Sequence, residues 1–151
     1  MTLEKTLVEH AFSRGLTGPQ VVSLLEVAGE VTFNEDQVIL VHRQRSDFFY
    51  LLTEGSVVVE LRAPTFSVCV QELGPGDVFG WSALLDQQDT LFHVRARERT
   101  TALRLPGEKL RAICRDDAQL GAELLTRVLR VVAGRVKATE VRFAEMCGVR
   151  V

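Results

Sequence analysis

The sequence predicts a mostly β domain, a jelly roll, with helices gathered at both ends. Residues 3–29 and 107–146 carry apolar side chains at helical spacing, whereas residues 31–105 alternate with period two and are rich in β-branched residues. Gly and Pro turns separate the short runs of the middle region, as in sandwiches and jelly rolls. The chain has 151 residues and no internal repeat or low-complexity linker, so residues 1–151 are expected to form one domain.

Two helices are expected before the first strand. The first runs from Leu3 to about Ser13, where apolar residues recur at helical spacing until a Ser-Arg-Gly segment stops the run. The second begins at Thr17, a good N-cap, with Pro19 just inside the helix and Gln20 at the capping-box position.

The strands are separated by recognisable turns. Glu54-Gly55 is typical of a tight hairpin, and Pro106-Gly107 closes the last strand. The expected strands are residues 38–41, 48–52, 56–61, 67–73 and 100–105.

After Gly107 the spacing is helical again, first in a short helix and then in a long one from about Asp117 to Met146, with Asp116 or Asp117 as its cap. One face of the long helix is a stripe that can either cover the jelly roll or pair with a second copy of the chain. We hypothesise from the sequence that the chain forms a homodimer through this stripe. The stripe consists of Leu124, Val128, Val131, Val132 and Arg135.

Composition excludes several classes of protein. A net charge of −2 lacks the basic excess that dominates binding to nucleic acids. The N-terminus has no signal-peptide pattern and no run is long enough to span a membrane, so a cytoplasmic protein is expected. The three cysteines have no Cys-x-x-Cys spacing, which favours free thiols over disulfides or zinc.

The segment from Gly74 to Leu85 carries the strongest functional signal. Gly76 and Gly80 permit positive φ, and a short helical turn after Gly80 would offer unpaired N–H groups and the Ser82 hydroxyl to an anion. A small acidic or nucleotide-like ligand is therefore a candidate partner. The alternative is that these glycines only shape a tight corner of the jelly roll.

The order of these elements resembles the cyclic nucleotide-binding domain over about residues 12–138. The most specific pieces are the Glu54-Gly55 hairpin, the Gly74-x-Gly76-Asp77-x-Phe79-Gly80 motif, and Val94-Arg95-Ala96 in the following strand. The chain is similar to small stand-alone bacterial members of that family. The resemblance implies the double-stranded β-helix fold of the family and a regulatory role in signal transduction.

Two departures from the family pattern bear on the ligand. The residue after Phe-Gly is usually a Glu that holds the ribose 2′-OH, and a later Arg pairs with the cyclic phosphate, but here these positions are Trp81 and Thr90. Trp81 donates one hydrogen bond and accepts none, so cAMP or cGMP is not expected to bind in the usual way. The expected ligand contacts are Gly76, Phe79, Gly80, Trp81, Ser82, Ala83, Thr90 and Leu91.

Other functions are not expected. Of the three histidines, only His42 and His93 could approach each other, which predicts neither a metal centre nor a cofactor, and no Ser or Cys has a nucleophile's surroundings. The chain ends at Val151, too early for the helix-turn-helix of the transcription-factor branch, so direct DNA binding is not expected. Two hypotheses remain: a non-catalytic ligand sensor, or a ligand-free dimerisation module whose pocket Trp81 and Leu91 fill.

Overall fold

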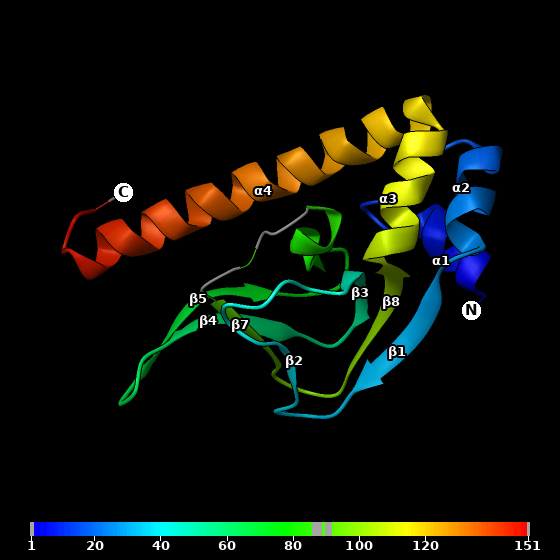
Figure 1. Ribbon diagram of the computed structural model, residues 1–151. Coiled ribbons are helices and arrows are strands. Elements are labelled where there is room, and N and C mark those ends of the chain that lie inside the picture. The colour runs from blue at the N-terminus through cyan, green and yellow to red at the C-terminus, as the bar shows by residue number, and fades with distance from the viewer. Residues whose placement is uncertain (1, 86–88, 90–91, 151) are drawn as a thin grey trace.

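The computed structural model describes residues 2–85, 89 and 92–150. Within these residues, eight antiparallel strands form two four-stranded sheets, accompanied by four α-helices and one short 3-10 helix. The two sheets form a jelly roll, and helices from both ends of the chain meet on the same side of it (Figure 1). The predicted fold class is confirmed, including the long C-terminal helix.

Two helices precede the strands, a short one lies between the sixth and the seventh strand, and two follow the last strand. The helices are α1 (Leu3–Glu9), α2 (Gly18–Leu25), η1 (Trp81–Leu84), α3 (Gly107–Asp116) and α4 (Ala118–Met146). One sheet has the order β1-β8-β3-β6 and the other β2-β7-β4-β5. The strands are β1 (Gly29–Phe33), β2 (Val38–Leu40), β3 (Phe48–Glu54), β4 (Val57–Arg62), β5 (Ser67–Leu73), β6 (Val78–Phe79), β7 (Phe92–Ala96) and β8 (Thr100–Pro106).

Strand β3, in the middle of its sheet, is buried on both faces. Phe49 and Leu51 of β3 pack into a cluster with the helices, whereas Tyr50 and Leu52 pack into a second cluster inside the jelly roll. A strand with both faces covered carries apolar residues at every position. This explains why residues 48–52 form a continuous apolar run in the sequence.

The sheet that contains β4 has apolar side chains on its inner face and a charged network on its outer face. Val57 and Val94 point into the jelly roll, whereas Glu60 and Arg95 lie on the outer face of β4 and β7. Successive side chains of a strand point to opposite faces, which separates these apolar and charged residues onto the two faces of the sheet.

The first helix is shorter than expected, ending at Glu9 and not near Ser13. His10 leaves the helix with extended backbone (φ −62°, ψ 138°), and its ring is buried. The ring's Nε2 bonds the Leu52 carbonyl oxygen (2.8 Å), and its Nδ1 accepts from the Phe12 N–H (3.1 Å). The bond from Phe12 takes the place of a helical bond after the end of α1, and the bond to Leu52 fixes α1 to the jelly roll.

The caps of the next helices follow the sequence prediction. The Thr17 hydroxyl accepts from the Gln20 N–H, and the Gln20 side chain accepts from the Thr17 N–H, which completes the capping box of α2. The Asp117 carboxylate accepts from the Leu120 N–H at 3.0 Å, so Asp117 is the cap of α4. The first strand begins at Gly29, inside the range expected to be helical, because Gly29 pairs with Arg104 of β8.

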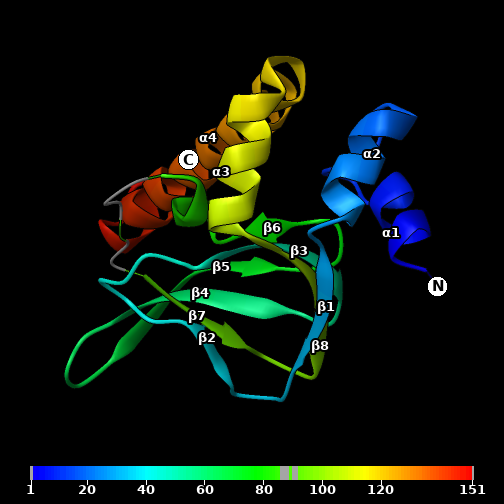
Figure 2. The same ribbon diagram turned by 45° about the vertical axis from the view of Figure 1, so that its right-hand side comes forward.

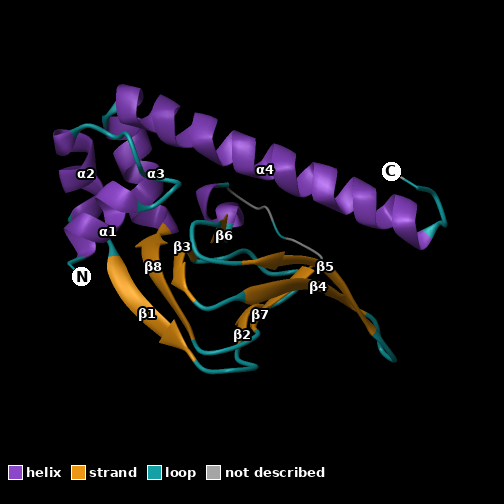
Figure 3. Cartoon of the chain, turned by 180° about the vertical axis from the view of Figure 1, so that it is seen from behind, coloured by secondary structure: helices purple, strands orange, loops and turns teal. Residues whose placement is uncertain are grey.

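The long helix α4 positions the candidate site. It leaves α3 and runs across the jelly roll, over η1 and toward β4 and β5 (Figures 1 and 3). Figure 2 shows α1 and α2 on the same side of the jelly roll as α3, at the end where β1 begins. None of the helices in residues 2–85, 89 and 92–150 has both the length and the apolar character needed to cross a membrane.

Candidate ligand-binding site

The predicted anion-binding segment, Gly74 to Leu85, contains the turn before β6, β6 itself and η1. Gly76 and Gly80 have φ of +94° and +83°, in the left-handed region predicted for both. A Cβ at Gly80 would lie 2.6 Å from the Phe48 carbonyl oxygen. The bend that places η1 over the edge of β3 therefore requires glycine.

Hydrogen bonds within the protein already engage part of η1. The Ser46 N–H donates to Ser82 Oγ (2.9 Å), which ties η1 to the loop before β3. The Ala83 N–H donates to the Gly80 carbonyl oxygen (3.1 Å). Ser82 and Ala83 are both buried. Since the first N–H groups of a helix have no intrahelical acceptor, those of Trp81 and Ser82 are not used within η1.

Trp81 faces α4. Its side chain is partly buried and packs against the cluster formed by the helices and the outer face of β3 and β8. The Arg135 guanidinium carbon lies 5.6 Å from the centre of the Trp81 ring, which is a cation–π contact. Trp81 does not belong to the cluster inside the jelly roll.

A pocket of about 390 Å³ lies between the inner face of the second sheet, η1 and α4. Of the predicted ligand contacts, Phe79, Gly80, Trp81 and Ser82 line it. Its other walls are mainly aliphatic and aromatic, and α4 closes one side of it. Lining residues that sequence reasoning did not place in a pocket include Leu40, Val59, Val70, Gln71, Val94 and Thr139.

The sequence predicts Arg135 on the dimer face of α4. In the structure its side chain lines the pocket, and its Nη2 donates to the Val78 carbonyl oxygen. Burial lowers the pKa of its guanidinium, and the nearby Asp77 carboxylate only partly opposes this. The available signal was that Arg135 is the one charged residue in a stripe of aliphatic residues.

The remaining predicted contacts lie outside this pocket or outside the described residues. Ala83 packs against α3, where its carbonyl oxygen accepts from Arg111. Thr90 and Leu91 fall outside the residues that the structure describes. Gly76 lines a second hollow on the other side of Arg135.

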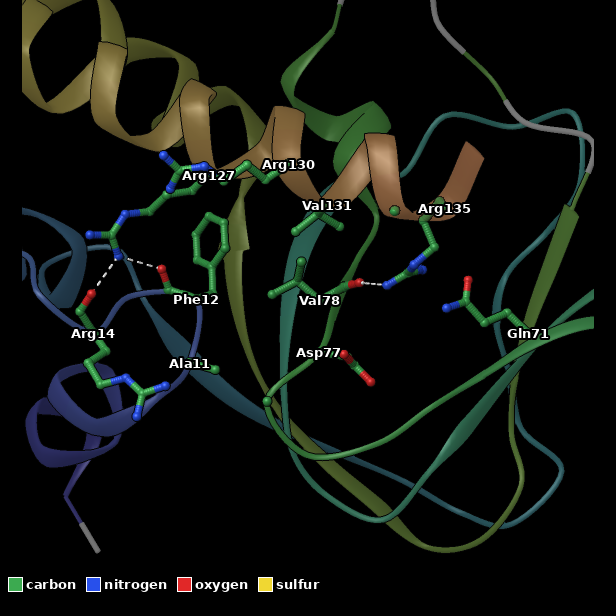
Figure 4. Close-up of a pocket in the computed structure, with 12 residues that line it drawn as sticks. Ala11, Phe12, Arg14, Gln71, Asp77, Val78, Arg127, Arg130, Val131 and Arg135 are labelled. Atoms are coloured by element: carbon green, nitrogen blue, oxygen red, sulfur yellow. Dashed lines mark hydrogen bonds between the residues drawn. The ribbon is translucent and has the colours of Figure 1, made fainter. Parts of the chain in front are cut away.

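This second hollow, of about 490 Å³, lies between the α1–α2 connection, the turn before β6 and α4 (Figure 4). Arg127 is part of its wall, but its guanidinium is engaged by the fold. The Arg127 Nη1 donates to the carbonyl oxygens of Phe12 (2.6 Å) and Arg14 (2.8 Å), and its Nε donates to Glu123 (2.8 Å). Asp77 sits in the middle of this hollow, where its carboxylate disfavours an anion.

The stripe expected to pair with a second copy is mostly used within the chain. Leu124 and Val128 are buried in the cluster between the helices and β3, and Val131 and Val132 pack against it. They can therefore not form the centre of a dimer interface while α4 stays on the jelly roll. The exposed apolar side chains of α4 are instead Leu125, Leu129, Val136, Phe143 and Met146.

The outer face of the second sheet carries a paired charge network. The Arg95 guanidinium bonds both Glu60 (3.3 Å) and Asp36 (2.8 Å), so Arg95 points away from the pocket. His42 and His93 do approach each other, with 2.9 Å between their Nδ1 atoms. In the described part of the chain, no three His, Cys, Asp or Glu side chains are grouped so that they could hold a metal ion.

Among sequences, the chain is 29% identical over 115 residues to the cAMP-dependent protein kinase regulatory subunit of Dictyostelium discoideum. This match covers 74% of the chain and 35% of that protein. The chain thus spans about a third of this relative.

Solved structures share the fold over almost the whole chain. A protein from Geobacter metallireducens GS-15 that has been assigned cyclic nucleotide binding superposes with a TM-score of 0.78 at 26% identity, covering 90% of this chain and 99% of that one. The regulatory subunit of a cAMP-independent protein kinase A from Trypanosoma brucei, solved as a triple mutant with cAMP in its A site, superposes with a TM-score of 0.75 at 20% identity. That match covers 96% of this chain and 50% of the other.

The family model for the cyclic nucleotide-binding domain matches residues 30–117, from β1 to the end of α3. This range is more than half of the chain and contains both sheets and η1. The chain therefore belongs to the cyclic nucleotide-binding domain family.

Proposed function

We propose that this protein is a non-catalytic regulatory module that binds a small ligand in the pocket beneath α4. The observation that carries the proposal is that α4 is itself a wall of the pocket, through Val132, Arg135 and Val136. A ligand there contacts the jelly roll and α4 together, so its binding energy depends on where α4 lies. A ligand can shift an equilibrium between helix positions by its difference in affinity for them.

The open pocket favours a sensor over the ligand-free alternative. If Trp81 filled the pocket, its ring would pack with the core inside the jelly roll. Instead, the ring packs toward α4 under Arg135, and a volume of about 390 Å³ remains beside it. This volume is within the range of ordinary small-molecule sites.

The ligand is proposed not to be a cyclic nucleotide bound in the usual way. Trp81 stands where the resemblance places a ribose-binding carboxylate, and Trp81 cannot accept a hydrogen bond. Loss of such a partner in a site costs a ligand several orders of magnitude in discrimination. The Trypanosoma brucei relative, named as part of a cAMP-independent kinase, supports the idea that this fold can serve without cAMP.

Calorimetric titration with cAMP and cGMP tests this proposal. We expect the wild-type chain to bind neither at micromolar concentration, and the double variant Trp81→Glu, Thr90→Arg to gain affinity for one of them. The single variant Thr90→Arg is the control, since the phosphate partner alone leaves the ribose unrecognised. Micromolar binding of cAMP by the wild-type chain would refute the proposed loss of the usual ligand.

A second role, homodimer formation, is proposed from the exposed face of α4. Leu129 and Phe143 are 67% and 68% exposed, and with Leu125 and Val136 they follow the spacing of a coiled-coil seam. Sedimentation of wild type and Leu129→Glu tests this role, with the exposed Thr126→Glu as the matched control on a polar part of the same helix. We expect a dimer that only Leu129→Glu dissociates, and a wild-type monomer at micromolar concentration would exclude it.

A further inference from the structure

We propose that the ligand of the pocket beneath α4 is an apolar monocarboxylate, with its carboxylate held by Arg135 and its apolar body between the sheet and α4. This inference rests on the proposed ligand-sensing function and gives that ligand a chemical class.

The first step is the charge of Arg135. Its guanidinium is partly buried, and among the residues that the structure describes it forms no ion pair. Its protein contacts are the hydrogen bond to the Val78 carbonyl oxygen and the Trp81 ring. A guanidinium has five N–H donors, and its planar fork matches a carboxylate. A buried cation without a counter-ion is costly, and a ligand carboxylate would remove that cost.

The second step is the position of Arg135. It lines both hollows, so it lies at the boundary between the pocket under α4 and the more open hollow outside it. Figure 4 shows its side chain pointing from α4 toward Val78 and the Gln71 amide, on the same side as the turn with Asp77. A carboxylate at this boundary would meet Arg135 and the Gln71 amide, while the rest of the ligand extends into the pocket.

The third step is the chemistry of the walls. The apolar part of the pocket lining comes from five strands and consists of Leu40, Val59, Val70, Phe79 and Val94. This part of the lining binds an apolar group and offers no hydrogen-bond partner to the hydroxyl groups of a ribose. It favours an alkyl or aryl body over a sugar.

The fourth step limits the ligand's charge. Glu140 lines the same pocket, so among the described lining residues an acidic group stands against the basic group of Arg135. This balance disfavours a phosphate with more than one negative charge but leaves room for one carboxylate at Arg135. A monoanion is therefore the charge state that the pocket fits.

Trp81 provides the measurement. It is the single tryptophan of the chain and it lines the pocket, so its fluorescence reports on the site alone. The probes are cyclohexylbutyrate and the matched neutral amide, cyclohexylbutanamide, which have the same apolar body and do not absorb where tryptophan is excited. We expect the acid to bind at least about tenfold more tightly than the amide, as for a charge-assisted bond.

Three variants separate the role of Arg135 from general effects. Arg135→Gln is expected to abolish the preference for the acid over the amide, and Arg135→Lys to restore part of it. Arg130→Gln, on an exposed turn of α4 outside this pocket, is the matched control and is expected to keep the full preference. Circular dichroism and melting temperature of each variant show that it is folded.

The outcomes distinguish the inference from the function on which it rests. Equal affinities for acid and amide, or a preference that persists in Arg135→Gln, would overturn the carboxylate inference and leave the sensor proposal intact. A response to cAMP or cGMP with none to either probe would do the same. No response to the probes, the cyclic nucleotides or a panel of neutral and anionic metabolites would overturn both.

Discussion

The two faces of the sheet β2-β7-β4-β5 differ in whether their charged side chains form ion pairs. On the outer face, the Glu60 side chain is only 7% exposed, and it accepts from Arg62 (3.0 Å) and Arg95 (3.3 Å), while Arg95 also bonds Asp36. On the inner side, Arg135 reaches over the pocket from α4 without an ionic partner among the described residues. Glu60, Arg62, Arg95 and Asp36 on the outer face are paired with one another. Arg135 on the inner side has no such ion pair with the described residues.

This difference indicates which charges stabilise the fold and which are free to bind a ligand. A charge that is paired within its own chain stabilises the folded state and interacts only weakly with a ligand. An unpaired, partly buried charge beside a pocket destabilises the folded state. A bound anion that pairs with this charge can stabilise the folded state again. Substitutions on the outer face should therefore change the free energy of unfolding, and substitutions at Arg135 should mainly change ligand binding.

The largest effect is expected from breaking the frame of the pocket at Gly80. The variant Gly80→Ala places a Cβ against the Phe48 carbonyl oxygen in a left-handed backbone, so we expect a loss of about 3 kcal/mol in the free energy of unfolding. Urea denaturation measures it. Gly74→Ala is the matched control in the same segment, because it has open space around it and no positive φ. Equal losses in both variants would contradict the argument.

The next effect is expected on the outer face. Burial would raise the pKa of Glu60, but hydrogen bonds from Arg95 and Arg62 outweigh this and hold it below its ordinary value. Glu60→Gln should cost about 2 kcal/mol, because the partly buried Arg95 and the more exposed Arg62 both lose a charged partner. In wild type this stabilisation should be complete above the ordinary glutamate pKa and be lost as the pH falls through the lowered one.

The control for Glu60 is an exposed pair in the same sheet. Glu72 bonds Arg97, and both side chains are more than half exposed. Glu72→Gln should cost less than about 1 kcal/mol, as for surface ion pairs. If the two substitutions lower the free energy of unfolding equally in urea denaturation, burial would not be the reason that the outer network stabilises the fold.

A smaller effect is expected from His10, which joins α1 to Leu52. Burial lowers the pKa of its imidazole, although the Leu52 carbonyl and Asp77 oppose this. The unfolded chain then binds more protons between the lowered pKa and the ordinary value of 6.5, so stability falls as the pH drops below 6.5. The His93 pKa is lowered in the same direction. We expect His10→Gln to flatten, not abolish, the fall in melting temperature on acidification, and an unchanged pH profile would contradict this role.

The smallest effect on folding is expected at Arg135. Arg135→Gln loses the hydrogen bond to Val78 but removes a partly buried charge, and the two changes oppose each other. We expect a change in the free energy of unfolding of less than about 1 kcal/mol. A larger loss would show that Arg135 mainly holds α4 in place, as the outer network holds its sheet.

Local features of the fold could be predicted from the sequence because local chemistry determines them. Positive φ at Gly76 and Gly80, the capping box of Thr17 and the cap at Asp117 each depend on residues a few positions apart. The continuous apolar run of residues 48–52 indicated a strand, and the structure explains it by burial on both faces.

Features that depend on distant segments could not be predicted. The end of α1 is set by a bond from His10 to Leu52, which lies 42 residues away. The role of Arg135 depends on the crossing of α4 over η1, which helical spacing does not fix. Helical spacing identified the stripe with Leu124 and Val128 as apolar, but could not tell whether this chain or a second copy buries it.

The way α4 is held gives it the mechanics of a lever. Its buried side chains end at Val128, and Met146 at its far end is 60% exposed. At about 1.5 Å per residue, the stretch from Val128 to Met146 is roughly 27 Å long, so a rotation of about 10° at Val128 would carry the tip through about 5 Å. A displacement too small to disturb the jelly roll would thus be magnified at the end of the helix, where another molecule could sense it.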